Sequence, residues 1–114
     1  MINPHPSLLP LYRGTDTYRR AIDAGDSKHG ASIHFVTAEL DGGPVFSQVV
    51  IPIEAGEYPD SLAAKLSPME HLLLVATVEF FAGHRVECSE GDILVDGEKL
   101  TGPLQLQADG RLQP

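Results

Sequence analysis

The stretch that decides the fold runs from residue 31 to residue 53 and reads ASIHFVTAELDGGPVFSQVVIPI. In its first part, apolar residues at 31, 33 and 35 alternate with Ser32 and His34, and the β-branched and aromatic content favours a strand over residues 31–37. The Asp-Gly-Gly-Pro run at 41–44 is a strong turn signal. A second β-branched run follows at 45–53, and the two runs are close enough in sequence to pair as antiparallel strands.

Helical spacing replaces this alternation after residue 59. Apolar residues recur about one turn apart and predict the main helical segment over residues 60–83; they are Leu62, Leu66, Met69, Leu73, Ala76 and Phe80. Pro68 forbids an unbroken ladder of hydrogen bonds. The run Ser67-Pro68-Met69-Glu70 is also typical of a helix start, with Ser at the N-cap, Pro at the first position and Glu at the third. We therefore expect a kink or a restart at Ser67.

Turn residues shape both ends of the chain. Three prolines and a glycine between residues 3 and 14 exclude a regular helix and predict a shaped loop. A short helix over residues 17–24 is expected next, capped by Asp16 and stopped by Gly25. Short apolar runs after residue 85, with the tight turn Asp96-Gly97 between them, predict a hairpin and tail appended over residues 85–114.

The length and net charge of the chain limit the classes of function that it can have. The chain has 114 residues, of which 42% are hydrophobic, which suits a single domain with one core. Its formal net charge of −8 disfavours nucleic acid and acidic membranes as partners. No apolar run approaches the length of a membrane span. The single cysteine, Cys88, excludes an internal disulfide. We therefore expect a cytoplasmic protein with neither a nucleic-acid nor a membrane partner.

Asn3, His5 and Asp41 carry the side chains best suited to proton chemistry at an acyl centre. An imidazole is the usual acid or base near neutral pH, an amide donates to a developing oxyanion, and a carboxylate holds an imidazole charged and oriented. In an extended segment, Asn3 and His5 project on the same side. From spacing alone, a simpler alternative stays open: Asn3 and His5 belong to a mobile N-terminus, and Asp41 only initiates its turn.

The other polar candidates have structural explanations. His34, on a predicted strand and pointing away from Ile33 and Phe35, is expected to be satisfied by hydrogen bonds. Glu70 fits the third position of a capping box. The remaining histidines do not stand at ligand spacing, so we expect no metal. No glycine-rich phosphate-binding motif occurs in the chain.

Several runs together resemble the C-terminal half of phosphoribosylglycinamide formyltransferase, a folate-dependent family of purine synthesis. These runs are residues 3–10, Gly14, residues 29–37 and residues 39–44. The likeness extends to about Gly83, and His-Pro-Ser-Leu-Leu-Pro with a later Asp-Gly-Gly-Pro favours this family over methionyl-tRNA formyltransferase and formyltetrahydrofolate hydrolase. The resemblance implies an α/β fold, the distal half of a Rossmann-like formyltransferase, with a mixed sheet, one long kinked helix and a terminal hairpin.

The resemblance also implies roles for individual residues. His5 would be the general acid and base, Asn3 would steady the tetrahedral oxyanion, and Asp41 would raise the proton affinity of the imidazole and order a water. The reaction implied is attack by the amine of glycinamide ribonucleotide on the formyl group of 10-formyltetrahydrofolate. The pterin site would be lined by Ala38, Glu39, Leu40, Asp41, Gly42 and Gly43. Glu70 matches a position that contacts the ribonucleotide, so its capping and binding interpretations both stay open. Arg13 is a candidate neighbour of the site.

The chain departs from the family because the Rossmann-like N-terminal half, with its phosphate-binding loop, is absent from the 114 residues. Two single positions also differ: Pro4 stands where isoleucine is common, and Ser67 replaces a longer polar side chain. We therefore expect small-molecule substrates and either an N-terminal half supplied in trans or a homo-oligomer. The alternatives are formyltetrahydrofolate hydrolysis by the same three side chains, and a catalytically silent fragment that acts as a binding module through an unpaired sheet edge.

Overall fold

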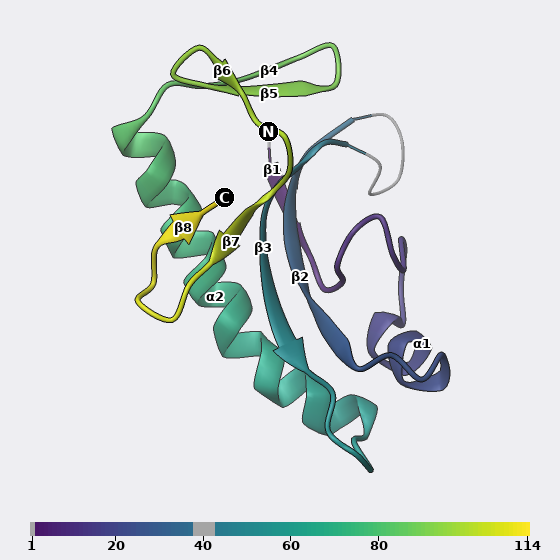
Figure 1. Cartoon of the computed structure of the whole chain (residues 1–114). Coiled ribbons are helices and arrows are strands. Elements are labelled where there is room, and N and C mark those ends of the chain that lie inside the picture. Colours follow the sequence, from purple (N-terminus) through teal and green to yellow (C-terminus); the bar gives the residue numbers. More distant parts are fainter. Residues whose placement is uncertain (1, 38–42) are drawn as a thin grey trace.

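The fold is built on a hairpin of β2 (Lys28–Phe35) and β3 (Val45–Pro52), seen here in a computed structural model that describes residues 2–37 and 43–114 (Figure 1). The two strands pair antiparallel from Lys28 opposite Pro52 to His34 opposite Val45. This pairing confirms the prediction from the sequence. Every residue of β2 from His29 to His34 is buried, so both faces of the strand are covered.

The hairpin lies at the centre of a five-stranded mixed sheet of order β1-β2-β3-β7-β8. β1 (Ile2–His5) pairs antiparallel with β2, β7 (Leu104–Leu106) pairs parallel with β3, and β8 (Leu112–Gln113) pairs antiparallel with β7. The first residues of the expected loop are therefore a strand. Pro4 is tolerated there because β1 is the outermost strand of the described sheet, where a missing N–H breaks no ladder. The return of the tail to this sheet was not predicted.

One face of the hairpin packs against α2 (Pro59–Gly83), a continuous helix with Pro68 inside it. Leu62, Leu66 and Leu73 are buried against Ala31 and Ile33 of β2. The expected restart at Ser67 is wrong. The buried leucines on either side of Pro68 hold the two parts of the helix against one surface, and this tertiary packing outweighs the missing backbone hydrogen bond.

The other face of β2 is covered by the segment of residues 6–16 between β1 and α1, because Leu8 approaches Gly30 and Ser32 donates a hydrogen bond to the carbonyl of Ser7. The helix α1 (Thr17–Asp23) packs against α2 (Figure 1). α1 closely follows its predicted range. Asp16 occupies the N-cap position but has a left-handed φ of 59° and makes no side-chain capping bond. The expected cap is therefore wrong, because an N-cap side chain reaches the first turn only from an extended backbone.

A second, three-stranded sheet lies at the C-terminal end of α2 (Figure 1). It contains β4 (Val86–Ser89), β5 (Asp92–Val95) and β6 (Glu98–Lys99), all antiparallel. Asp96 and Gly97 have φ values of 51° and 85°, as the expected tight turn requires. A second apolar cluster, in which Phe46 of β3 meets Ile93 of β5, ties this sheet to the main one. No helix in the described part of the chain is long and apolar enough to cross a membrane.

Gly30 of β2 lies in close contact with both β3 and the connecting segment. A Cβ atom at this position would lie 2.0 Å from the carbonyl oxygen of Val49 and 2.6 Å from Cδ2 of Leu8. The first contact is with backbone, which cannot swing away as a flexible side chain can. Only glycine therefore fits at this position of β2.

We predict that Gly30→Ala lowers the free energy of unfolding by about 3 kcal/mol, because the added methyl group forces the backbone apart. Chemical denaturation measures this change. The matched control is Gly83→Ala at the end of α2, where a Cβ would meet nothing within 4 Å. It should leave stability unchanged or raise it by about 0.5 kcal/mol. Equal effects of the two substitutions would contradict the close approach at Gly30.

Candidate active site

His5 lies at the end of β1 with only 5% of its surface exposed. Its Nε2 atom is 2.8 Å from the carbonyl oxygen of Tyr12. A carbonyl oxygen can only accept, so Nε2 carries a proton, and in the neutral ring proton transfer runs through Nδ1. The buried imidazole is thus held in one tautomer by the backbone of the segment that follows it.

Tyr12 holds that carbonyl in place through an unusual backbone conformation. Its φ is 53°, in the left-handed region that bulky residues rarely adopt. Two contacts hold the Tyr12 side chain. Its hydroxyl donates to Oδ2 of Asp26, and the guanidinium of Arg20 lies 5.3 Å from the centre of its ring. Backbone strain that is held by specific contacts is characteristic of functional sites.

Asn3 lies two residues before His5 on the same strand, so the two side chains project on the same side of β1 as the sequence predicts. Asn3 is exposed, and it stands opposite His34 of β2 in the strand register. His34 is buried, with its Nδ1 atom 3.1 Å from the carbonyl oxygen of Phe35. The β1–β2 pair therefore places the exposed amide of Asn3 opposite the buried imidazole of His34.

Glu70 lies on α2 and is half-buried. Burial raises the pKa of its carboxyl above the usual range, and the charge of His5 offsets part of this rise. The same carboxylate acts on Tyr18 of α1, because burial, reinforced by the charge of Glu70, raises the pKa of Tyr18 to about 12. Glu70 does not belong to a capping box, since Ser67 lies within a continuous helix and not at its start.

His29 is a site neighbour that sequence reasoning missed. It is 1% exposed, its ring packs edge-on against Tyr18 at 5.3 Å, and it hydrogen-bonds the carbonyl of Pro6. Burial lowers its pKa, and the nearby charge of His5 lowers it further. The neutral form of His29 is therefore favoured. In the sequence, His29 only begins the run of residues 29–37 that resembles the family and does not stand at metal-ligand spacing, and neither feature distinguishes a structural histidine from a functional one.

Part of the predicted site lies outside the described residues. These positions are Ala38, Glu39, Leu40, Asp41 and Gly42, so the pairing of Asp41 with His5 stays a prediction. Gly43 is buried, and a Cβ there would lie 1.7 Å from the carbonyl oxygen of Phe35. Arg13 is exposed, and its carbonyl accepts a hydrogen bond of 2.8 Å from Arg20. Within residues 2–37 and 43–114, no group of three His, Cys, Asp or Glu residues is arranged to hold a metal ion.

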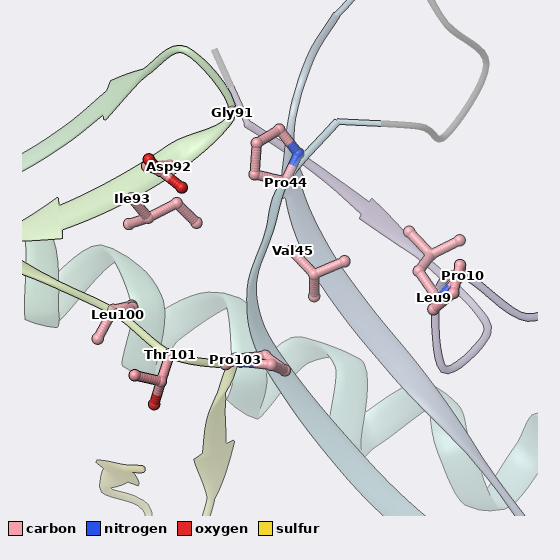
Figure 2. Close-up of a pocket in the computed structure, with 11 residues that line it drawn as sticks. Leu9, Pro10, Pro44, Val45, Gly91, Asp92, Ile93, Leu100, Thr101 and Pro103 are labelled. Atoms are coloured by element: carbon pink, nitrogen blue, oxygen red, sulfur yellow. The ribbon is translucent and has the colours of Figure 1, made fainter.

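A cavity of about 320 Å³ opens on the other side of the connecting segment (Figure 2). Its walls are mainly apolar and come from Leu9 and Pro10, from Pro44 and Val45, and from β5 together with the chain before β7. Asp92 contributes a carboxylate at its edge. Asn3, His5 and Glu70 do not line this cavity. The described site candidates therefore lie outside this cavity, on β1 and α2.

Comparison with known proteins decides the family. Residues 1–78 match the family described as formyl transferase. The chain belongs to the formyl transferase family. The phosphoribosylglycinamide formyltransferase of Escherichia coli (strain K12) is 43% identical to it over 100 residues, which cover 88% of this chain and 47% of that protein. This result confirms the resemblance carried by the Asn-Pro-His-Pro and Asp-Gly-Gly-Pro runs.

Solved structures of formyl transferases confirm the mixed α/β fold. The phosphoribosylglycinamide formyltransferase of Coxiella burnetii superposes with a TM-score of 0.82 at 36% identity, covering 90% of this chain and 50% of that one.

A sequence relative with another activity is also similar: a formyltetrahydrofolate deformylase from Synechocystis sp. is 35% identical over 86 residues, which cover 75% of this chain and 30% of that protein. The chain spans about half the length of the two formyltransferases.

Because burial raises the pKa of Glu70, ionisation of its carboxyl lowers the free energy of unfolding. An acid whose pKa is higher in the folded state than in the unfolded state destabilises the fold once the pH exceeds its unfolded value of about 4.5. We predict that Glu70→Gln raises the melting temperature near neutral pH, and that this gain disappears as the pH falls below about 4.5. Thermal unfolding followed by circular dichroism across this range checks both parts.

Glu79→Gln serves as the control, because Glu79 is an exposed glutamate of the same helix. A surface change of this kind should alter stability by no more than about 0.5 kcal/mol. A gain for Glu70→Gln that persists below the unfolded pKa would show that burial of the charge is not its cause.

Proposed function

We propose that this chain provides the proton-transfer half of a formyltransferase site, which moves the formyl group of 10-formyltetrahydrofolate to the amine of glycinamide ribonucleotide. The observation that carries the proposal is the buried imidazole of His5, whose Nε2 is held by the Tyr12 carbonyl. The similarity to phosphoribosylglycinamide formyltransferases supports this choice of donor and acceptor.

In the proposed reaction, the substrate amine attacks the formyl carbon and a tetrahedral oxyanion forms. Nδ1 of His5 takes the proton that the amine loses and later returns it to the departing folate nitrogen. The amide of Asn3, exposed on the same side of β1, donates to the oxyanion. Asp41 is proposed to raise the proton affinity of the imidazole and to order a water, and the loop of residues 38–43 is proposed to line the pterin site.

Glu70 is proposed to bind the ribonucleotide. An ionised carboxylate only accepts hydrogen bonds and repels phosphate, so its natural partners on such a substrate are hydroxyl and amine groups. Glu70 occupies a half-buried position, where burial raises the pKa of its carboxyl and opposes ionisation. A residue whose charge works against folding at such a position is a candidate for a role in binding.

A partner that completes the site is part of the proposal. The net charge of −8 repels a substrate phosphate, and the 114 residues contain no glycine-rich loop to receive it. β1, which carries Asn3 and His5, is the outer strand of the described sheet and offers an edge for pairing. We propose that an N-terminal formyltransferase half, or a second copy of the chain, supplies the missing surface in the cytoplasm.

The test is formyl transfer with and without such a half. We predict little or no turnover by the purified chain alone and restored turnover when a matching N-terminal formyltransferase half is added, together with a higher melting temperature. Robust transfer by the chain alone would contradict the need for a partner. Formate release that does not require the amine acceptor would favour deformylase activity, which the similarity to the Synechocystis protein supports. A stable complex with the added half that neither transfers the formyl group nor hydrolyses formyltetrahydrofolate would favour a catalytically silent binding module.

His5 can be tested in the same reconstituted system. We predict that His5→Asn lowers kcat by about 10²-fold or more and leaves KM for the formyl donor nearly unchanged, because the imidazole moves protons and does not anchor the folate. His71→Asn is the matched control, since His71 is an exposed histidine of α2. Equal activity of the His5→Asn and unaltered proteins would remove His5 from the mechanism.

A further inference from the structure

The segment that follows His5 is tied to the sheet through one buried hydroxyl. Ser32 of β2 is fully buried, and its Oγ atom donates to the carbonyl of Ser7 at 2.7 Å while accepting from the backbone N–H of Leu9 at 3.0 Å. The N–H of Ser7 in turn donates to the carbonyl of His5 at 2.9 Å. The backbone immediately after the candidate catalytic histidine is therefore anchored on Ser32.

Gln48 of β3 completes this anchor. Its Nε2 atom donates to the carbonyl of Leu9 and to Oγ of Ser32, each at 3.1 Å. Ser32 thus uses its one donor and both of its acceptor positions, and both amide hydrogens of Gln48 are used as well. Gln48 is 8% exposed, so loss of these partners would leave buried polar groups without hydrogen bonds.

The last link comes from the tail of the chain. Nε2 of Gln105, on β7, donates to Oε1 of Gln48 at 3.1 Å. The register of the parallel β3–β7 pair places Gln105 directly beside Gln48. This residue lies beyond the 1–78 stretch that matches the family, yet it orients the amide that holds the backbone of Leu9. A donor on Gln105 directs Oε1 of Gln48 toward the tail and its NH₂ group toward the segment.

We infer that Gln105, Gln48 and Ser32 form a positioning relay through which the C-terminal tail sets the tautomer and placement of the His5 imidazole. The relay ends on the same segment whose far end supplies the Tyr12 carbonyl to Nε2 of His5. Its three residues act through the backbone of this segment and are positioning residues, not catalytic ones. The kinetic consequence rests on the proposed function, whereas the effect on the imidazole does not.

The first test uses the unaided chain and needs no activity. Gln105→Met keeps the size of the side chain and removes the donor. The control is Gln113→Met, because Gln113 stands opposite Gln105 on β8 and is exposed. Nitrogen-15 NMR of the His5 ring reports its tautomer, and amide hydrogen exchange reports the bond from Leu9 to Ser32.

We expect Gln105→Met to speed exchange of the Leu9 amide by about fivefold, as loss of support for one hydrogen bond predicts, and to shift the His5 tautomer signals. Gln113→Met should change neither. Equal changes in both variants, or unchanged His5 signals in a folded Gln105→Met protein, would overturn the relay. If Gln105→Met does not fold, Gln105→Glu serves instead, since an ionised carboxylate of the same length cannot donate to Gln48.

The second test uses the reconstituted enzyme. Gln105→Met should lower kcat by roughly 10-fold or more with little change in KM, because displacement of a catalytic group affects the transition state more than binding. A loss of stability alone, with kcat preserved in the folded fraction, would leave Gln105 a purely structural residue and contradict the relay. Failure of every variant, including the unaltered chain, to transfer formyl would refute the proposed function, while the NMR result would still decide the relay.

Discussion

The rest of the structure depends on the burial of β2 on both of its faces. Odd-numbered residues such as Ala31 and Ile33 meet the leucines of α2, and even-numbered residues such as Gly30 and Ser32 meet the segment that carries Tyr12. Apolar contacts form the first interface, whereas hydrogen bonds to backbone form much of the second. The alternation of a strand therefore separates a stabilising face from a face that shapes the candidate site.

The candidate site combines several features that work against stability. Tyr12 holds a left-handed backbone, Glu70 keeps a carboxylate where burial raises its pKa, and His29 is buried where burial lowers its pKa. Each is held by the surrounding fold, since the strand register and the packing of α1 against α2 leave these groups little freedom. Such local penalties, gathered around one buried imidazole, are what a preorganised site for proton transfer requires.

Prediction from the sequence succeeded where a signal is local and repeated. The alternation around Ile33, the turn after it and the helical spacing from Leu62 onward led to the correct hairpin and main helix. It failed where distant contacts decide: β1 forms only because β2 is there to pair with it, and α2 continues through Pro68 because a common core lies beneath both of its parts. β7 has three residues, too few for a periodic pattern, and its place in the sheet comes from β3.

For the candidate site, the sequence by itself nominated the chemical groups, because Asn3 and His5 stand in a run that resembles a known family and Glu70 matches a position of that family. Only the tertiary structure decided which nitrogen of His5 carries the proton, since the Tyr12 carbonyl reaches it through a folded segment. It also decided that Glu70 lies inside a continuous helix and is not part of a helix cap, and that Gln105 is linked through Gln48 to the segment after His5. These relations join residues far apart in the chain, and such distances depend on packing, which no local pattern encodes.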